Sequence, residues 1–508
     1  MNTFKKKSLY AALAGVSALG VTGAAQAVNV NPEGLGQVLI YPYFTTRADN
    51  LGNAYGTLLS VVNTTASAKA VKVRFLEGKN SREVLDFNLF LSAKDVWTAA
   101  ILDDAATGGA RVLTADRSCT LPAKDIWTHL GGDVYAQSFV NYAYVGDADD
   151  KGGASLDRTK EGYVEIIEMG TYTSSDDTWD AVTHVNGVPK CEDLDEAVAE
   201  DEIDGVRGGL FGGETLISVD SGTDFTADAV ALDNFLDPEF SNYHEAGSTL
   251  PDLTQADPVS VVIGPDGAAY ISDWSATDAS GNPVYNNADP VSAVLIRQNV
   301  MNEYVLDAGT ASGTDWVVTM PTKRFYVRTG SGLAPKLFQR NFNRTEGACD
   351  DVSLSIYDRE ERTTTTPLSF SPRPPTQTNA LCWEANVLTF TKANGARSNV
   401  LGSLNVTNLP YRFENGWLDL GFFPSSVTGS VHKLINKDTD ITRFGFGTSF
   451  GQTVTYVGLP VVGFMVQTFM NGTVQVGNPP VSVLSNYGGS FVHKYRTQID
   501  RGWTISAQ

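Results

Sequence analysis

The sequence predicts a mainly β protein, made of antiparallel β-sandwich units of immunoglobulin-like or jelly-roll-like type, with long irregular insertions and few helices. Apolar side chains recur at every second position in many short segments, as in Val71, Val73 and Phe75. Lys72 and Arg74, which lie between them, are expected to face water, as in a strand with one solvated face. Glycine, threonine, asparagine and aspartate cluster between such segments and indicate turns.

The strand pattern is clearest in the N-terminal part, where we expect an antiparallel sandwich over residues 28–170. Strands are predicted there at residues 38–44, 57–63, 70–76 and 83–91, with further strands at residues 134–145 and 163–168. A second β region is expected over residues 311–508. Its predicted strands are residues 315–320, 324–328, 352–357, 383–391, 402–407, 417–422, 452–456, 461–469 and 490–493.

Residues 171–310, between these parts, are rich in acidic and loop-like sequence. One short helix is predicted within residues 192–204 and another near residues 290–303, with Asp289-Pro290 as its start, because proline is favoured in the first turn of a helix. We interpret this region as long irregular insertions over a β core or as a small irregular domain. A proline-rich connector is present further on, at residues 367–375.

The first 27 residues have the three parts of a secretory signal peptide. Lysines occupy positions 5–7, an apolar stretch follows at residues 9–21, and a small-x-small cleavage site ends at Ala27. We therefore expect export, with the mature chain in the periplasm, at the cell surface or outside the cell. No later window has the roughly 18 consecutive apolar residues of a spanning helix, so no transmembrane segment is predicted in the mature chain.

The chain is acidic, with 58 Asp and Glu against 37 Lys and Arg and a formal net charge of −21. Such a charge repels nucleic acid and anionic lipid, so nucleic acid is excluded as a partner. The turn at residues 147–152 begins like a calcium-binding EF-hand loop, but Lys151 and Arg158 occupy two of its ligand positions. Calcium in this turn, or in the acidic turns at 200–204 and 278–282, would be weakly bound and structural. No other cofactor is predicted.

Four cysteines, Cys119, Cys191, Cys349 and Cys382, lie two in each half of the chain. None belongs to a C-x-x-C motif or has a histidine at metal-ligand spacing. In an oxidising compartment an even number of cysteines indicates disulfides. Of the three possible connectivities we favour Cys119–Cys191 and Cys349–Cys382, because each loop then stays within one half.

One short segment, LSAKDVWT, recurs as LPAKDIWT and carries Trp97 and Trp127. Exposed tryptophans would bind a planar ligand such as a sugar, and Tyr41 and Tyr43 would add further aromatic faces. Alternatively, the segment is a repeated turn whose tryptophan packs back on the sheet. The second interpretation is favoured, because tryptophan buries a large apolar area and is commonly part of the core.

No motif requires a catalytic site. Ser449 lies in a G-x-S-x-G pattern, but a nucleophile elbow needs a helix after the serine, and residues 452–457 are β-like. A glycine-rich hairpin is the better interpretation. The histidines are scattered and form no zinc motif; they are His129, His184, His244, His432 and His493.

Several segments of the chain resemble a group of uncharacterised exported β-rich proteins of Gram-negative bacteria. The resemblance covers most of the mature chain and implies export and a shared fold. It implies no activity and no site residues, because the function of that group is unknown. The segments are GLGQVLIYPYFTT (34–46), TLLSVVNTT (57–65), KAVKVRFLEGKNSREVLDFNL (69–89), TDWVVTMPTKRFYV (314–327) and LSNYGGSFVH (484–493).

Export, two expected disulfides, acidic composition and dense strands favour a non-enzymatic structural or interaction protein of the periplasm or cell surface. Its partner would be another copy added at a strand edge, another surface protein or a glycan. One alternative is a carbohydrate- or other ligand-binding module that uses the aromatic rings named above. Another is a secreted hydrolase that uses Ser449 or a carboxylate pair in a cleft.

Overall fold

The computed structural model describes residues 26–328, 337–343, 346–363, 379–391, 395–410, 413–429, 431–443 and 447–502. Antiparallel strands dominate these residues, which confirms the predicted mainly β fold with sandwich units and few helices. Most of the expected signal peptide (residues 1–25) and the proline-rich connector lie outside the described residues. The α-helices of the described chain are α2 (Asp177–Val182), α3 (Glu196–Glu202) and α4 (Asp289–Leu295).

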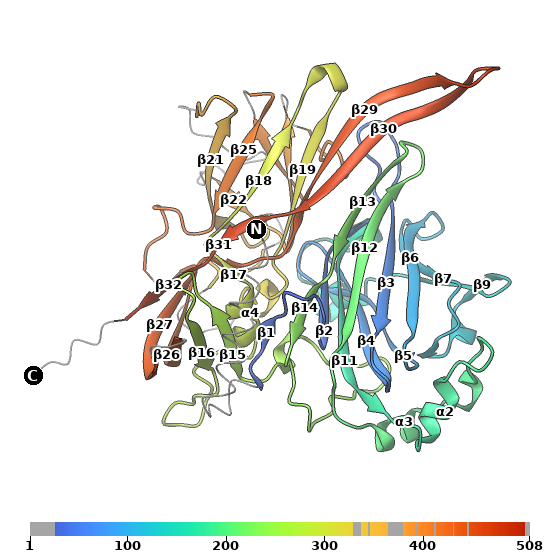
Figure 1. Ribbon diagram of the computed structural model, residues 1–508, viewed down its shortest axis with the longest axis vertical. Coiled ribbons are helices and arrows are strands. Elements are labelled where there is room, and N and C mark those ends of the chain that lie inside the picture. Colours follow the sequence, from blue (N-terminus) through green and yellow to red (C-terminus); the bar gives the residue numbers. More distant parts are fainter. Residues whose placement is uncertain are drawn as a thin grey trace, which may run out of the picture.

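Two sheets pack face to face in the N-terminal half, which is the right-hand side of Figure 1. Their facing side chains, among them Val73, Phe87 and Trp97, form one hydrophobic core. Sheet I has the order β1 (Asn29–Val30), β14 (Val230–Asp233), β2 (Val38–Thr45), β11 (Glu161–Tyr172), β4 (Ala68–Glu77), β5 (Glu83–Leu91), β8 (Cys119–Leu121). Sheet II has the order β13 (Thr223–Asp228), β12 (Leu210–Ser218), β3 (Gly56–Asn63), β6 (Val96–Asp104), β7 (Gly109–Thr114), β10 (Val134–Ser138), β9 (Thr128–Gly131).

The C-terminal half, on the left of Figure 1, contains three larger sheets and two short strand pairs. Sheet III has the order β24 (Val406–Pro410), β23 (Ala385–Thr391), β19 (Gly313–Thr319), β29 (Phe464–Val476), β30 (Val481–Val492), and only β23 and β24 are parallel among its described strands. Sheet IV has the order β21 (Ser353–Asp358), β25 (Asn415–Gly421), β18 (Asn299–Val305), β31 (Lys494–Arg496). Sheet V has the order β15 (Val259–Ile263), β16 (Ala269–Asp273), β26 (Lys433–Arg443), β27 (Gly447–Val457), β32 (Gln498–Arg501). The short pairs are β17 (Ile296–Arg297) with β28 (Leu459–Pro460) and β20 (Asp350–Asp351) with β22 (Ala380–Leu381).

Sheet I is covered on both faces, because its second face packs against the C-terminal half. Val38 and Tyr163 on that face belong to the same core as Trp316 and Leu388 of sheet III. Every residue of β4 and β11 is therefore buried.

The prediction that Lys72 and Arg74 face water is therefore wrong. Both side chains are buried and paired with acids: Lys72 Nζ lies 2.9 Å from Asp86 Oδ2, and Arg74 Nε lies 2.8 Å from Glu83 Oε2. Alternation along β4 does distinguish the two faces of the strand. It does not reveal that a second layer, rather than solvent, covers the polar face.

The strands of residues 171–310 are distributed over both halves instead of forming an irregular unit of their own. β12 and β13 extend sheet II, β14 lies inside sheet I, and β15 and β16 form one edge of sheet V. The helix predicted within residues 192–204 is present as α3.

Three local predictions need correction. The helix expected at residues 290–303 ends at Leu295, and the chain continues as β17 and β18 because alternate residues such as Val300 and Tyr304 are buried between sheets. Residues 324–328 form no strand: a 3₁₀ turn at Lys323–Phe325 takes their place, with the Lys323 ammonium buried 3.0 Å from Asp350 Oδ2. The strand expected at residues 134–145 ends at Ser138.

Candidate interaction surface

The aromatic residues proposed for sugar stacking lie inside the protein. Trp97 and Trp127 belong to the same core cluster and both contact Phe87, at ring-centroid distances of 5.9 and 5.2 Å. Tyr41 and Tyr43 are fully buried, and their hydroxyls donate to Ser60 O and to a carboxylate. A ring without an exposed face cannot stack on a sugar, so these four residues provide no binding platform. The repeated segment is a repeated turn with a core tryptophan.

The cysteines pair as expected, as Cys119–Cys191 and Cys349–Cys382. The G-x-S-x-G segment forms the beginning of β27, where Ser449 lies opposite Ile441 of β26. A β-hairpin is therefore present where a nucleophile elbow would need a strand followed by a helix.

The acidic turns are occupied by their own hydrogen bonds. Asp150 accepts from Arg158 Nη2 at 2.7 Å and from Asn80 Nδ2 at 2.9 Å, and Asp278 closes its turn by accepting the backbone N–H of Asn282 at 2.9 Å. Among the residues that the structure describes, no group of three or more His, Cys, Asp or Glu side chains is arranged to hold a metal ion.

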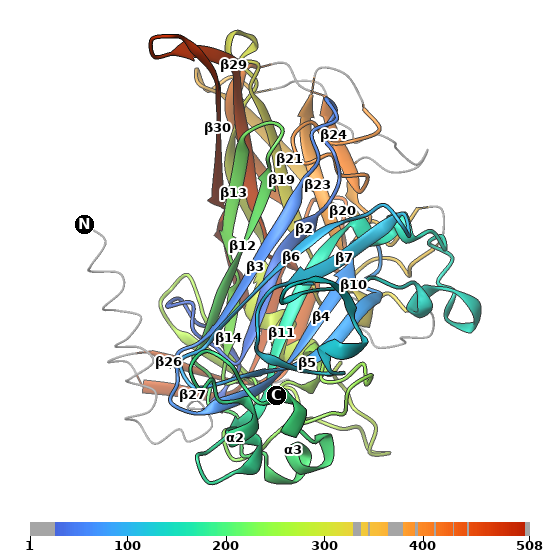
Figure 2. The same ribbon diagram turned by 90° about the vertical axis from the view of Figure 1, so that its right-hand side faces the viewer.

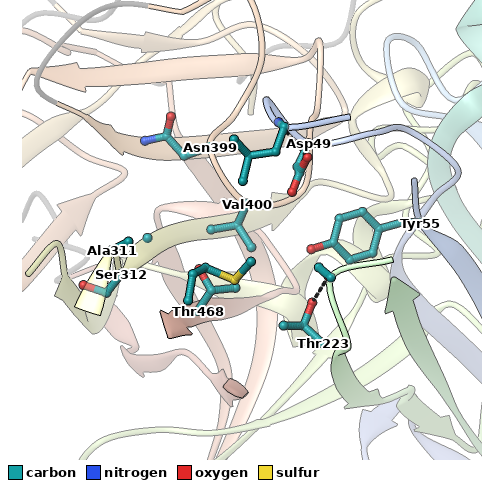
Figure 3. Close-up of a pocket in the computed structure, with 12 residues that line it drawn as sticks. Asp49, Tyr55, Thr223, Ala311, Ser312, Asn399, Val400 and Thr468 are labelled. Carbon is teal, nitrogen blue, oxygen red and sulfur yellow. Dashed lines mark hydrogen bonds between the residues drawn. The ribbon is translucent and has the colours of Figure 1, made fainter. Parts of the chain in front are cut away.

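A cavity of about 160 Å³ lies where the two halves meet near the base of the β29–β30 hairpin, and Figure 3 shows its lining. Asp49 is the single charged residue among the described lining residues. Its carboxylate accepts the backbone N–H groups of Leu51 and Asn53 at 2.8 and 2.9 Å, so it holds its own loop in place. The other polar groups of the described lining are hydroxyls and one amide, among them Tyr55, Thr223 and Asn399.

The hairpin of β29 and β30, which we call the arm, projects from the fold. Figures 1 and 2 show it continuing well beyond the other strands of the molecule. β29 pairs with β19 only from Met465 to Thr468, whereas β29 and β30 pair with each other as far as Val476 and Val481. All residues from 471 to 483 are exposed.

The arm carries an apolar face at its tip. Val474 lies opposite Val483 and Val476 lies opposite Val481, so the four valine side chains share one face. They are 43–61% exposed. The other face of the tip is polar: Gln475 and Ser482 face each other there and are joined by a hydrogen bond.

The arm also lacks charge. No Asp, Glu, Lys or Arg occurs from residue 444 to residue 493, although charged residues make up 19% of the chain. This run is present in the sequence and is a signal from which the arm could have been found. Its meaning depends on the fold, because a long uncharged segment is equally typical of a buried strand.

The proximal part of the arm is fixed to the N-terminal half. Asn486 Nδ2 donates to Ser221 O at 2.7 Å, and the Ser490 hydroxyl donates to Thr226 O of β13. Gly488 is required at this contact, because a Cβ there would lie 2.8 Å from the ring of Phe225. The arm is therefore held at its base and projects only at its tip.

No helix in the described ranges has the length and hydropathy needed to cross a bilayer. No family model matches the chain, and no curated protein is significantly similar to it.

Proposed function

We propose that this protein is an exported, non-enzymatic structural or interaction protein of the periplasm or cell surface, and that it assembles with copies of itself through the arm. The observation that carries the proposal is an uncharged, two-stranded projection with an exposed valine face on a protein whose net charge is −21.

The charge distribution favours the arm as the contact between copies. Two molecules of this net charge repel each other, and the repulsion is largest where acidic side chains approach closely. A contact through a segment with no Asp, Glu, Lys or Arg side chain buries no unpaired charge of these residues. The arm lies within the longest such segment of the sequence, residues 444–493.

The structure of the tip also favours a partner. Two-stranded hairpins that pack on nothing else are marginally stable in water. Beyond Thr468, β29 pairs with no described strand other than β30, so the edges of the tip present unpaired backbone groups. Such edges are the usual route for adding a strand from another chain, and burying the valine face would add a hydrophobic contribution.

Export is supported by the expected signal peptide and the two disulfides. Cleavage after Ala27 would leave β1 in the mature chain, since β1 begins at Asn29. The resemblance to exported β-rich proteins agrees with this placement.

The test is sedimentation velocity of the mature chain over a range of protein concentrations. We expect the wild type to associate, and the double variant Val474→Asp/Val483→Asp to remain monomeric because it places two carboxylates on the apolar face. The matched control is Gln475→Asp/Ser482→Asp, which adds the same charge to the opposite face of the same strands and should still associate. Added NaCl should strengthen association by screening the repulsion between the acidic bodies.

A wild type that stays monomeric at every concentration contradicts the proposal. If both double variants lose association equally, charge anywhere on the hairpin prevents association. That result would contradict a specific role for the valine face.

A further inference from the structure

A second cavity, of about 300 Å³, lies where four separate segments converge beside strands β4 and β5 of sheet I. Its walls come from the β4–β5 hairpin, from the 3₁₀ turn at Tyr142–Tyr144, from the segment around residues 249–252 and from the 3₁₀ turn that follows β19. We call it the arginine pocket, because four of its lining residues are Arg74, Arg82, Arg324 and Arg328, whereas its acids are Glu83 and Asp252. Basic residues thus outnumber acidic ones here, in a chain where acids outnumber bases 58 to 37.

Arg74 has donor capacity that its present partners do not use. Its Nε donates to Glu83 Oε2 at 2.8 Å and its Nη1 donates to Glu165 Oε2 at 2.5 Å. Its Nη2 has no hydrogen-bond partner among the described residues, although the side chain is only 1% exposed. A buried guanidinium nitrogen without an acceptor is unfavourable, and the pocket is the space from which an acceptor can approach.

The two neighbouring arginines make long contacts with acidic side chains, and Arg324 Nη1 also donates to Ser81 O at 3.0 Å. Arg82 Nε lies 3.4 Å from Asp150 Oδ2, an oxygen that Arg158 Nη2 already contacts at 2.7 Å. Arg324 Nη2 lies 3.3 Å from Asp252 Oδ2. Because both contacts with acids are at the long end of the hydrogen-bond range, Arg82 Nε and Arg324 Nη2 keep capacity to bind another anion.

We propose that the arginine pocket binds a small oxyanion with several acceptor oxygens, a carboxylate or phosphate group, through Arg74, Arg82 and Arg324. Guanidinium groups recognise both anions by paired N–H···O bonds, and a partly enclosed cavity strengthens such contacts relative to water. Bound oxygens would give Arg74 Nη2 its missing acceptor. The inference is independent of the arm, because no residue of the arm lines the pocket.

The test is isothermal titration calorimetry of the mature protein with inorganic phosphate and, separately, with citrate, at constant ionic strength set by NaCl. We expect a saturable site for at least one anion. Arg82→Gln should weaken binding at least tenfold, because it removes one of the proposed anion-binding guanidinium groups. Arg82 is 32% exposed, so it can be changed without opening the core. Arg117→Gln is the matched control: Arg117 is also ion-paired, to Asp133, but does not line the pocket, and binding should be unchanged.

A second variant guards against an effect of Arg82 on folding. Thr249 is exposed on the pocket rim, so Thr249→Asp adds a negative charge there and leaves every arginine in place. It should weaken binding with an unchanged circular dichroism spectrum. Tighter binding of citrate assigns the site to polycarboxylates, and tighter binding of phosphate assigns it to phosphate groups. Binding of neither anion to the wild type, or equal binding to Arg82→Gln and wild type, overturns the proposal.

Discussion

Buried charged side chains occur on both faces of sheet I. Lys69 Nζ lies 2.5 Å from Glu168 Oε1 with neither side chain exposed, and Glu168 also accepts the backbone N–H groups of Arg207 and Gly208. Removing one member of such a pair leaves an uncompensated buried charge, which costs more than the pair itself contributes. These residues therefore limit which layers can pack on sheet I more than they add to its stability.

Two other buried carboxyl groups predict how stability depends on pH. Burial raises the pKa of Glu384 to about 8 and the pKa of Asp289 to about 7. The native state then keeps protons that the unfolded chain has released, so the contribution of these groups is complete below their ordinary pKa values and is lost as the pH rises toward 8. We expect the free energy of unfolding in urea to fall between pH 5 and pH 8.

The variant Asp289→Asn should make this fall smaller, because an amide cannot ionise. The control Asp147→Asn changes an exposed carboxyl and should leave the pH dependence as in the wild type. If the free energy of unfolding changes with pH equally in Asp289→Asn and wild type, Asp289 does not hold a proton in the native state.

At the scale of elements, the edges of the sheets are protected in different ways. β8, the edge of sheet I, has three residues, and Cys119 at its start is joined to Cys191 in the segment between α2 and α3. A short, cross-linked edge offers little backbone for pairing with another chain. The tip of the arm has no comparable protection. The β8 edge is therefore covered within the molecule, whereas the tip of the arm is available for assembly.

The Cys119–Cys191 disulfide is predicted to hold α2 and α3 against sheet I. It spans 72 residues, so in the chain-entropy treatment its loss lowers the free energy of unfolding by about 4 kcal/mol. In Cys119→Ser/Cys191→Ser we expect faster hydrogen exchange in α2 and α3, measured by mass spectrometry, with exchange in β18 and β25 unchanged. Unchanged exchange in both helices would mean that the small apolar cluster around Tyr172 holds them without the disulfide.

At the scale of the whole molecule, the two halves share their core. Thr319 Oγ1 donates to Pro42 O at 2.7 Å, and Ser81 Oγ donates to Glu384 Oε2 at 2.9 Å, so residues far apart in sequence are joined across the junction. Apolar residues of sheets I and III belong to one cluster. Each half by itself would therefore leave an apolar sheet face exposed to solvent.

This shared core predicts that a fragment of residues 28–310 does not fold independently. It would expose the second face of sheet I, including Val38 and Tyr163, and would lose β26, the strand that pairs with β16. In scanning calorimetry the mature chain should unfold in one transition, and the fragment should give none. A fragment with its own cooperative transition would contradict the shared core.

The predicted strands at residues 38–44, 57–63 and 83–91 are present because period-2 alternation and turn residues are local properties of the chain. The cysteine pairing was also chosen correctly, from spacing alone. Prediction failed where a helical and a strand pattern overlap, as after Leu295, because burial between two sheets decided the outcome.

By itself, the sequence determined the mainly β class, most strand positions, the acidic charge and the uncharged run that became the arm. Tertiary structure decided what covers each strand face: it buried Trp97 and Trp127, enclosed the charges of β4 and brought Arg74, Arg82 and Arg324 around one cavity. The physical reason is that alternation specifies two faces of a strand, whereas the layer against each face comes from residues hundreds of positions away.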